Sequence, residues 1–147
     1  MPTGDTERAA PAVTPLTEPY WAAAAEGTLA LQHCGACERF VHFPASSCPT
    51  CGRGDGLSFE PVSGRGVVYT YSVVHRTFAP GFDDRVPYVI AWIDVPEQPG
   101  LRVFGNVLDC DPDDVRIGMP VEVCFETIEG FGPVPNFRPA SAAGAGR

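Results

Sequence analysis

Two Cys-x-x-Cys pairs lie in the first third of the chain: Cys34 with Cys37 and, ten residues later, Cys48 with Cys51. Each pair can turn tightly enough to point two sulfurs at one place, and two facing pairs supply the thiolate tetrahedron of a structural zinc site. Such a closed site leaves no position for water or substrate, so we expect the metal to hold shape without doing chemistry. Iron can use the same four ligands and is the main alternative; two disulfides are a third interpretation.

The other two cysteines stand apart from this pattern. Cys110 and Cys124 have no companion at ligand spacing. Neither has beside it the histidine or the positive charge that would activate a thiol. We therefore expect no nucleophilic role for either residue.

No targeting or membrane segment is evident. Residues 1–15 lack the apolar core of a secretory signal, and no segment approaches the roughly twenty apolar residues of a membrane span. A reducing cytosol leaves thiols free to bind metal and disfavours disulfides. We therefore expect a cytoplasmic protein that has no membrane partner.

The charge argues against nucleic acid as a ligand. The formal net charge is −8, and all ten cationic side chains are arginines. Nucleic-acid-binding proteins usually carry a basic stripe, because phosphate neutralisation dominates their affinity. Here carboxylates gather in DCDPDD at 109–114, a stretch without the glycine and distal glutamate of a calcium loop. We interpret this stretch as a solvated turn.

The chain divides into four predicted parts: a disordered tail at 1–15, a helix with a zinc ribbon at 16–60, a barrel at 61–138 and a disordered tail at 139–147. Thr17 is placed to cap a short helix that begins near Pro19, and Gly27 is placed to end it. The segments LALQHC, FVHFP and LSFEPV then surround the cysteine pairs as strands, the order of a zinc ribbon.

From Gly64 onward the hydrophobic pattern has a period of two. VVYTYSVVH, YVIAWIDV, LRVFGNVLD and VEVCFETI are four strand candidates separated by turn-forming residues. LSFEPV or the C-terminal NFRP brings the number to about five, which suits a small barrel that closes on itself and removes its sheet edges. The fold class is therefore mainly β, with an OB-type barrel preferred over a sandwich.

Two regions could carry binding. The loop at 76–87 is longer than an ordinary hairpin connection and presents Phe78 and Phe82 beside Arg76 and Arg85. This mixture suits an acyl chain, an adenine or a partner protein; alternatively, both phenylalanines fold back onto the barrel as a lid.

The second region is the helix that carries Tyr20 and Trp21, which either pack on the chain's own ribbon or dock on another subunit. His75 ends a strand and is interpreted as a polar cap, because no nucleophile motif or paired carboxylate accompanies it. His33 and His42 flank the cysteines, but four sulfurs already complete a ligand set.

Several segments in order resemble one known family: the helix and cysteine pairs in PYWAAAAEGTLALQHCGACERFVHFPASSCPTCG, then VSGRGVVYTYSVVHR, PYVIAWIDV and VRIGMPVEV. They are similar to the acyl-CoA-associated OB-fold/rubredoxin-like zinc-ribbon family, formerly a domain of unknown function, over roughly residues 18–138. The resemblance implies an N-terminal helix, a zinc ribbon and a C-terminal OB barrel. It places the metal ligands on the same four cysteines and carries over no catalytic residue.

Members of that family are typically partners of thiolase-fold enzymes or are associated with MaoC-like enoyl-CoA hydratases. The resemblance therefore implies a hetero-oligomeric, non-catalytic accessory subunit of an acyl-CoA-processing complex. We expect Arg65, Arg76 and Arg85 to be the contacts for CoA phosphates, because the guanidinium fork suits phosphate oxygens. His75 is a further candidate contact for CoA or for the partner.

Two alternatives come from other classes. One is a stand-alone acyl-CoA thioesterase or hydratase in which His75 acts with Asp83 or Asp84. The other is a single-strand nucleic-acid-binding protein, since OB barrels often bind bases on aromatic platforms. The acidic charge disfavours the second alternative.

Overall fold

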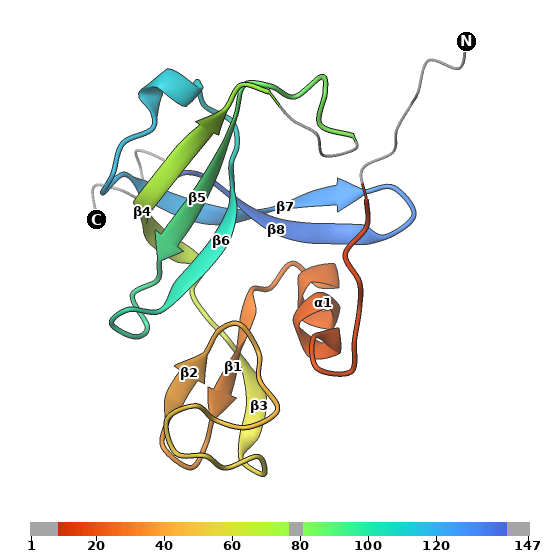
Figure 1. The fold of residues 1–147 in the computed structure, drawn as a ribbon, viewed down its shortest axis with the longest axis vertical. Coiled ribbons are helices and arrows are strands. Elements are labelled where there is room, and N and C mark those ends of the chain that lie inside the picture. The colour runs from red at the N-terminus through yellow and green to blue at the C-terminus, as the bar shows by residue number, and fades with distance from the viewer. Residues whose placement is uncertain (1–8, 77–80, 141–147) are drawn as a thin grey trace.

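A computed structural model describes residues 9–76 and 81–140, so the ends of both predicted tails, at 1–8 and 141–147, lie outside the described residues. The elements in chain order are α1 (Glu18–Ala25), β1 (Ala30–Cys34), β2 (Arg39–Val41), β3 (Leu57–Pro61), β4 (Arg65–Val74), β5 (Tyr88–Asp94), β6 (Arg102–Val107), the 3-10 helix η1 (Pro112–Asp114), β7 (Pro120–Ile128) and β8 (Gly132–Pro139). Figure 1 shows a small ribbon below a barrel, with α1 beside the ribbon and beneath β7 and β8. The predicted class, mainly β with one N-terminal helix, is confirmed. Within the described part of the chain, no helix has the length and apolar character needed to cross a membrane.

The ribbon is a three-stranded antiparallel sheet with β1 in its centre, between β2 and β3. Gln32 on β1 is only 3% exposed. Its Nε2 donates to the carbonyl of Ala45 (2.9 Å), and its Oε1 accepts from the N–H of Ala45 (2.8 Å). These two bonds satisfy the buried amide and fix the segment that follows β2.

Helix α1 differs in one detail from the prediction. Thr17 occupies the N-cap position but makes no capping bond. Instead, its Oγ1 accepts a hydrogen bond from the N–H of Thr14 (3.0 Å), because residues 14–17 form a turn of their own before the helix. Gly27 follows the helix with φ +76°, a left-handed conformation that favours glycine and ends the helix as predicted.

The barrel closes in the order β4-β5-β6-β8-β7, with β7 paired back onto β4. Buried Val89, Ala91 and Ile93 alternate along β5 with side chains that face outward. The fifth barrel strand is β8, which contains the NFRP segment, whereas LSFEPV lies largely in β3 of the ribbon. The predicted OB-type barrel is confirmed, and the choice between the two candidate fifth strands is settled.

The turn between β5 and β6 joins the barrel to the ribbon. Gln98 Oε1 accepts from the N–H of Phe40 (2.8 Å), and Gln98 Nε2 donates to the Phe40 carbonyl (3.2 Å). Next to it, Glu97 Oε2 accepts from the N–H of Ser63 (2.7 Å) in the connection between the two units. The side chains of this turn therefore form hydrogen bonds with the ribbon's edge strand β2 and with the connection that follows β3.

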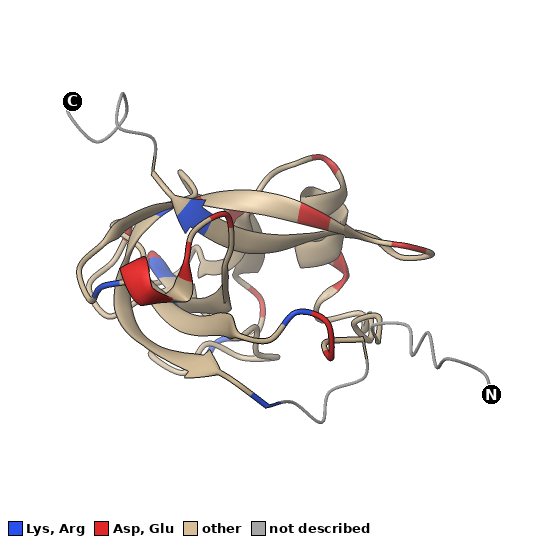
Figure 2. Cartoon of the chain, turned by 90° about the horizontal axis from the view of Figure 1, so that it is seen from above, with Lys and Arg blue, Asp and Glu red and all other residues tan. Residues whose placement is uncertain are grey.

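Acidic residues lie mostly in loops, and Figure 2 shows them on the short helix η1 and on several connections. Asp111, Asp113 and Asp114 are exposed. Asp111 Oδ1 accepts from the N–H of Asp113 (2.9 Å), so this aspartate caps η1. The expected solvated turn at 109–114 is confirmed.

The two glycines of the segment SGRG lie where the barrel has no room for a side chain. A Cβ on Gly64, which has φ +82°, would lie 2.4 Å from Cγ1 of Val123. A Cβ on Gly66 would lie 2.6 Å from the carbonyl oxygen of Asp94 and 2.5 Å from Cγ2 of Ile93. Strands β4, β5 and β7 approach here more closely than any side chain allows.

We predict that Gly66→Ala destabilises the protein by about 1–3 kcal/mol, because the added methyl must displace backbone in a packed barrel. Ser72→Ala, an exposed position on the same strand, is the matched control and should change stability by less than about 0.5 kcal/mol. Urea unfolding of the three proteins measures this difference. Equal midpoints for Gly66→Ala and the unmodified chain would contradict the steric account.

Candidate metal centre and aromatic cavity

The four predicted cysteine ligands converge at one end of the ribbon. Cys34 Sγ lies 3.6 Å from Cys51 Sγ, Cys37 Sγ lies 3.6 Å from Cys48 Sγ, and all four sulfurs lie within 4.8 Å of one another. Metal–sulfur bonds of about 2.3 Å in a tetrahedron give sulfur–sulfur edges of about 3.8 Å, whereas a disulfide bond is about 2.05 Å long. The quartet therefore fits one structural metal ion.

The charges of the four cysteine sulfurs also favour a bound cation. The backbone N–H groups of Cys51 and Thr50 lower the pKa of Cys48 to about 6, with the Thr50 N–H 3.4 Å from the sulfur. Burial and the neighbouring sulfurs raise the pKa of Cys37 to about 12. Four sulfurs in contact cannot all be thiolates without compensation, and a bound metal ion supplies it.

The two histidines near the cysteines lie outside the ligand set, as expected. His33 Nδ1 lies 3.7 Å from the carboxylate of Glu60 on the neighbouring strand β3. His42 faces a cavity formed with α1 and the barrel. Four sulfurs would complete the coordination shell of one structural ion and leave no open position on it.

A cavity of about 460 Å³ lies where the helix, the ribbon and the barrel meet. Tyr20 and Trp21 from α1 form one wall, Phe43 after β2 forms another, and Phe104 on β6 lines the barrel side. Apart from the side-chain amides of Asn106 and Asn136, this lining is largely apolar. A concave apolar site with a few polar groups is typical of binding sites.

Aromatic contacts run from the barrel to the ribbon along this cavity. On the barrel, Trp92 and Phe104 are cross-strand neighbours with ring centroids 5.1 Å apart. Trp92 lies 6.1 Å from Phe43, which lies 4.6 Å from the ring of His42. Phe43 is 63% exposed and Phe104 is 47% exposed, which is unusual for phenylalanine.

The contacts continue from the ribbon to the helix. The ring of His42 lies 6.2 Å from Tyr20, Tyr20 meets Trp21 edge to face at 4.7 Å, and Trp21 meets Phe131 of the β7–β8 turn at 5.4 Å. Tyr20 also packs against the main hydrophobic core, and burial raises its pKa to about 12. Both predicted helix residues therefore pack within the chain, and both also border the cavity.

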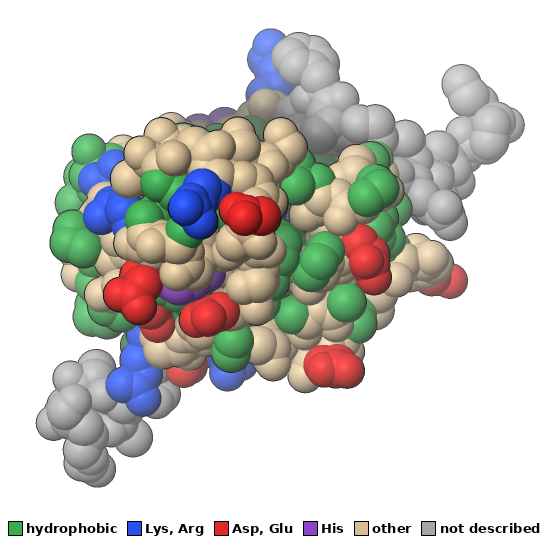
Figure 3. Space-filling view, turned by 90° about the horizontal axis from the view of Figure 1, so that it is seen from below, with side chains coloured by type: hydrophobic (Ala, Val, Ile, Leu, Met, Phe, Trp, Pro, Cys, Tyr) green, Lys and Arg blue, Asp and Glu red, His purple; other side chains and the backbone are tan. Residues whose placement is uncertain are grey.

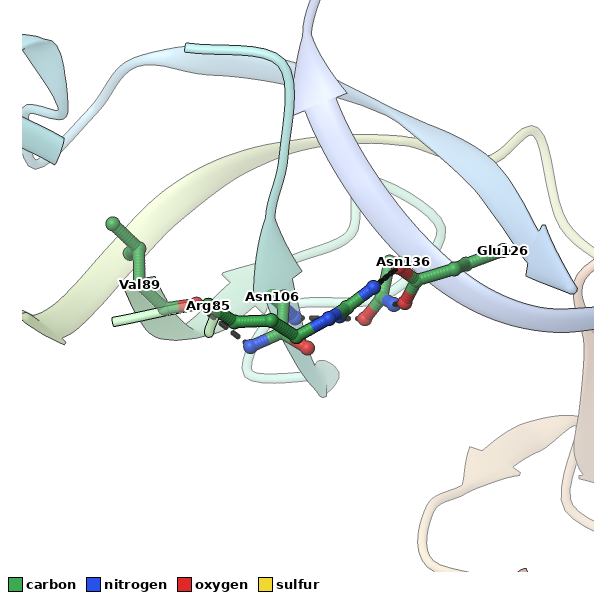
Figure 4. A network of polar contacts seen from close by, with 5 residues as sticks. All are labelled: Arg85, Val89, Asn106, Glu126 and Asn136. Carbon is green, nitrogen blue, oxygen red and sulfur yellow. Dashed lines mark hydrogen bonds and ion pairs between the residues drawn. The ribbon is translucent and has the colours of Figure 1, made fainter. Parts of the chain in front are cut away.

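A polar network lies beside the cavity (Figure 4). Arg85, from the loop before β5, forms an ion pair with Glu126 on β7. Asn136 Nδ2 donates to Glu126 Oε1 (3.0 Å), and Asn136 Oδ1 accepts from the N–H of Asn106 (2.8 Å). Asn106 Nδ2 donates to the Val89 carbonyl (2.9 Å). The network ties the end of the long loop to four barrel strands, β5, β6, β7 and β8.

The arginines expected to contact CoA are not gathered at one place. Arg65 and Arg76 are exposed near opposite ends of β4, and Arg85 is held by Glu126, whose hydrogen bond raises the pKa of the guanidinium. Phe82 lies 5.1 Å from the ring of Tyr88 and lines the cavity. CoA contact at these residues stays a prediction, and Phe78 lies outside the described residues.

The three residues of the enzyme alternative lie at the surface. His75 is exposed just beyond the end of β4, and Asp83 and Asp84 are exposed. Within 9–76 and 81–140, His75 forms no ion pair or hydrogen bond. No assembled acid–base pair is therefore found at this histidine.

Phe43, Trp92 and Phe104 were not singled out from the sequence. A signal for Trp92 was present, because the alternation in YVIAWIDV places it on the outer face of the barrel, where a large aromatic residue is unusual. Phe43 carried no such signal, since its position depends on how the ribbon sits against the barrel.

His42, which lines the cavity, makes the stability of the folded protein depend on pH. Its Nδ1 is buried and has no hydrogen-bond partner among the described residues, and burial lowers the pKa of His42 to about 4 from an ordinary value of 6.5. Below pH 6.5 the unfolded chain binds a proton that the folded chain excludes, so stability falls as the pH drops. We predict a loss of about 1–2 kcal/mol between pH 7 and pH 5 from this group.

The variant His42→Phe keeps a ring at this position and should remove that part of the loss. Urea unfolding of both proteins at pH 7 and pH 5 gives the stability that each loses. The difference between the two losses is the contribution of His42, because the other titrating groups contribute equally to both. An identical pH dependence of stability in both proteins would contradict the assignment.

Known proteins match both units of the fold. A family model described as the rubredoxin-like zinc ribbon domain of ChsH2 matches residues 21–57. A second, described as the C-terminal OB-fold domain of ChsH2, matches residues 59–126. A solved chain titled Ltp2-ChsH2(DUF35) aldolase superposes with a TM-score of 0.80 at 34% identity, covering 90% of this chain and all of that one.

Two curated relatives differ in how much of their length is shared. A DUF35 domain-containing scaffold protein from Methanocaldococcus jannaschii is 45% identical over 103 residues, which are 69% of this chain and 67% of the relative. A probable enoyl-CoA hydratase alpha subunit from Thermomonospora curvata is 36% identical over 121 residues, which are 82% of this chain but 36% of the relative. The chain thus spans about a third of the hydratase subunit. On these matches, the chain belongs to the DUF35 family of proteins that join a ChsH2-type zinc ribbon to an OB-fold domain.

Proposed function

We propose that the protein is a non-catalytic accessory subunit of an acyl-CoA-processing complex, which docks on a thiolase-fold enzyme and helps to position its CoA thioester. The observation that carries the proposal is the match over 90% of the chain to a subunit whose structure is titled as part of an aldolase. The relative named as a scaffold protein supports the same role.

The chemistry of the chain agrees with this role. The metal centre is closed by four sulfurs, and no catalytic pair forms at His75 among the described residues. On the face seen in Figure 3, acidic and apolar side chains are interspersed and the arginines are scattered. This distribution supports a protein-binding role over the nucleic-acid alternative.

The partner enzyme has two candidate types. The aldolase match favours a thiolase-fold subunit, as the resemblance in the sequence implied. The relative named as a hydratase alpha subunit favours an enoyl-CoA hydratase of the MaoC-like type as the second candidate. We place the thiolase-fold partner first, because the solved aldolase chain is covered completely whereas the hydratase subunit is covered only in part.

We propose zinc as the metal, bound in a reducing cytoplasm by Cys34, Cys37, Cys48 and Cys51. Natively purified protein should contain about one zinc per chain and be colourless. Elemental analysis that finds iron in a coloured protein would replace zinc by iron, and material with disulfides and no metal would contradict the site.

Cys34→Ser should lose the metal and unfold the ribbon, because the short strands β1, β2 and β3 cannot hold the sheet without it. Cys124→Ser is the matched control, since this cysteine lies outside the quartet, and it should keep one metal per chain. Metal content and amide hydrogen exchange of residues 30–61 measure both effects. Retention of stoichiometric metal in Cys34→Ser would contradict the assignment.

The accessory role predicts that a thiolase-fold enzyme encoded beside this protein needs it. Co-expression should raise the soluble yield and activity of that enzyme at least tenfold, because a surface left uncovered without the subunit favours aggregation. The purified chain alone should not turn over CoA thioesters. An enzyme that is equally soluble and active alone contradicts the role, and turnover by the chain that His75→Ala abolishes would favour the stand-alone enzyme.

A further inference from the structure

Three exposed or half-exposed aromatic side chains form a continuous surface beside the cavity. This aromatic face consists of Phe43 from the ribbon and Trp92 and Phe104 from the barrel, each ring in contact with the next. Phe43 and Phe104 line the cavity while keeping about half or more of their surface in water. Exposed apolar surface beside a hollow marks interaction sites.

The ribbon contributes the most exposed ring of this face. Residue 43 follows β2, and the hydrogen bonds between Gln32 and Ala45 fix the segment in which it lies. The ring is therefore held in water by a fixed backbone. A rigid aromatic group that is already ordered loses little conformational entropy when a partner covers it.

Two arginines near the aromatic face are paired with carboxylates of the chain itself. Arg102, two residues before Phe104, pairs with Asp94 (Nε–Oδ1 2.8 Å) and lies 3.7 Å over the ring of Tyr69. On the other side, Arg85 pairs with Glu126. Phosphate groups need cations that are free to pair with them, so this face suits neither a nucleic acid nor a phosphate-rich ligand.

The cavity lining also offers neutral polar groups, the side-chain amides of Asn106 and Asn136. Asn106 lies outward on β6, two residues after Phe104, and its Oδ1 accepts no hydrogen bond from any described residue. A neutral acceptor beside apolar rings matches the chemistry of a protein segment, which offers backbone or side-chain N–H groups together with apolar side chains. Such aromatic anchors next to a pocket dominate the binding energy of many protein interfaces.

We propose that the aromatic face and the cavity behind it receive an uncharged, apolar segment of the thiolase-fold partner, with one aromatic or branched aliphatic side chain seated in the cavity. This inference rests on the proposed function and specifies the docking surface. The docked segment contacts the ribbon and the barrel together, so the partner binds only when both units hold their relative orientation. A metal-free ribbon would displace Phe43 and weaken docking without touching the partner.

The test uses the variants Phe43→Ser and Phe104→Ser, singly and together, in the full metal-bound chain. Ile117→Ser is the matched control, because Ile117 is 70% exposed and is no part of the aromatic face. Calorimetric titration against the purified thiolase-fold partner should show at least a tenfold affinity loss for each single variant and at least a hundredfold loss for the double variant. The control should bind within twofold of the unmodified chain.

Retained metal content and melting temperature confirm that the variants are folded. A second readout labels the two tryptophans of the chain with 5-fluorotryptophan, one at Trp21 and one at Trp92. Binding of the unlabelled partner should shift the fluorine resonance of Trp92, assigned with Trp92→Phe.

The outcomes separate this inference from the proposed function. If the unmodified chain binds the partner and the Phe43 and Phe104 variants bind equally well, the docking surface is wrong while the accessory role stands. If the unmodified chain binds no thiolase-fold partner, both fail. If the free chain forms a dimer that the double variant loses, a second copy of the chain occupies this face and the inference is overturned.

Discussion

The convergence of four sulfurs at one point is the constraint on which the rest of the molecule depends. Strands β1, β2 and β3 are short, with β2 only three residues long, and a sheet of this size is marginal in water without support. A metal ion joins the two cysteine turns and replaces the core that the ribbon lacks. The segment that carries Phe43 begins where β2 ends, so the metal that braces the ribbon also makes this segment rigid.

The cavity forms only when the barrel and the ribbon keep a fixed relative orientation, because both line it. The hydrogen bonds from Gln98 to Phe40 hold the ribbon edge from one side. Helix α1 holds the other side, with Tyr20 packed against the core and Trp21 against Phe131. The cavity lies between these two attachments and is lined by all three parts of the chain. The described part of the chain thereby presents a preformed concave surface, which suits the proposed role as an accessory subunit.

Local features of the fold could be predicted from the sequence, because their causes lie close together along the chain. The cysteine spacing predicted the metal centre, and the period-two pattern predicted β4 to β7. Strand β8 was ambiguous because it contains Pro133, Pro135 and Pro139, which lack the N–H of a central strand. The structure tolerates these prolines because β8 is fully paired only with β7 and meets β6 at a single residue pair.

The candidate site could be predicted only in part. Tyr20, Trp21 and Phe82 were identified as candidates and do border the cavity. The pairing of Arg85 with Glu126 was not foreseen, because it joins residues that are 41 positions apart. The exposure of Phe43 and Phe104 depends on the angle between two separately folded units, and hydrophobic periodicity within either unit carries no information about that angle.

The central claim is that a metal-braced, catalytically inert chain offers one aromatic surface to a partner enzyme. Hydrogen exchange of the full metal-bound chain, measured with and without the thiolase-fold partner, tests it most directly. The account predicts slower exchange on binding in the segments 40–45 and 102–107, which carry Phe43 and Phe104, and no change in η1. Slower exchange confined to other parts of the chain, or no change in any segment, would contradict it.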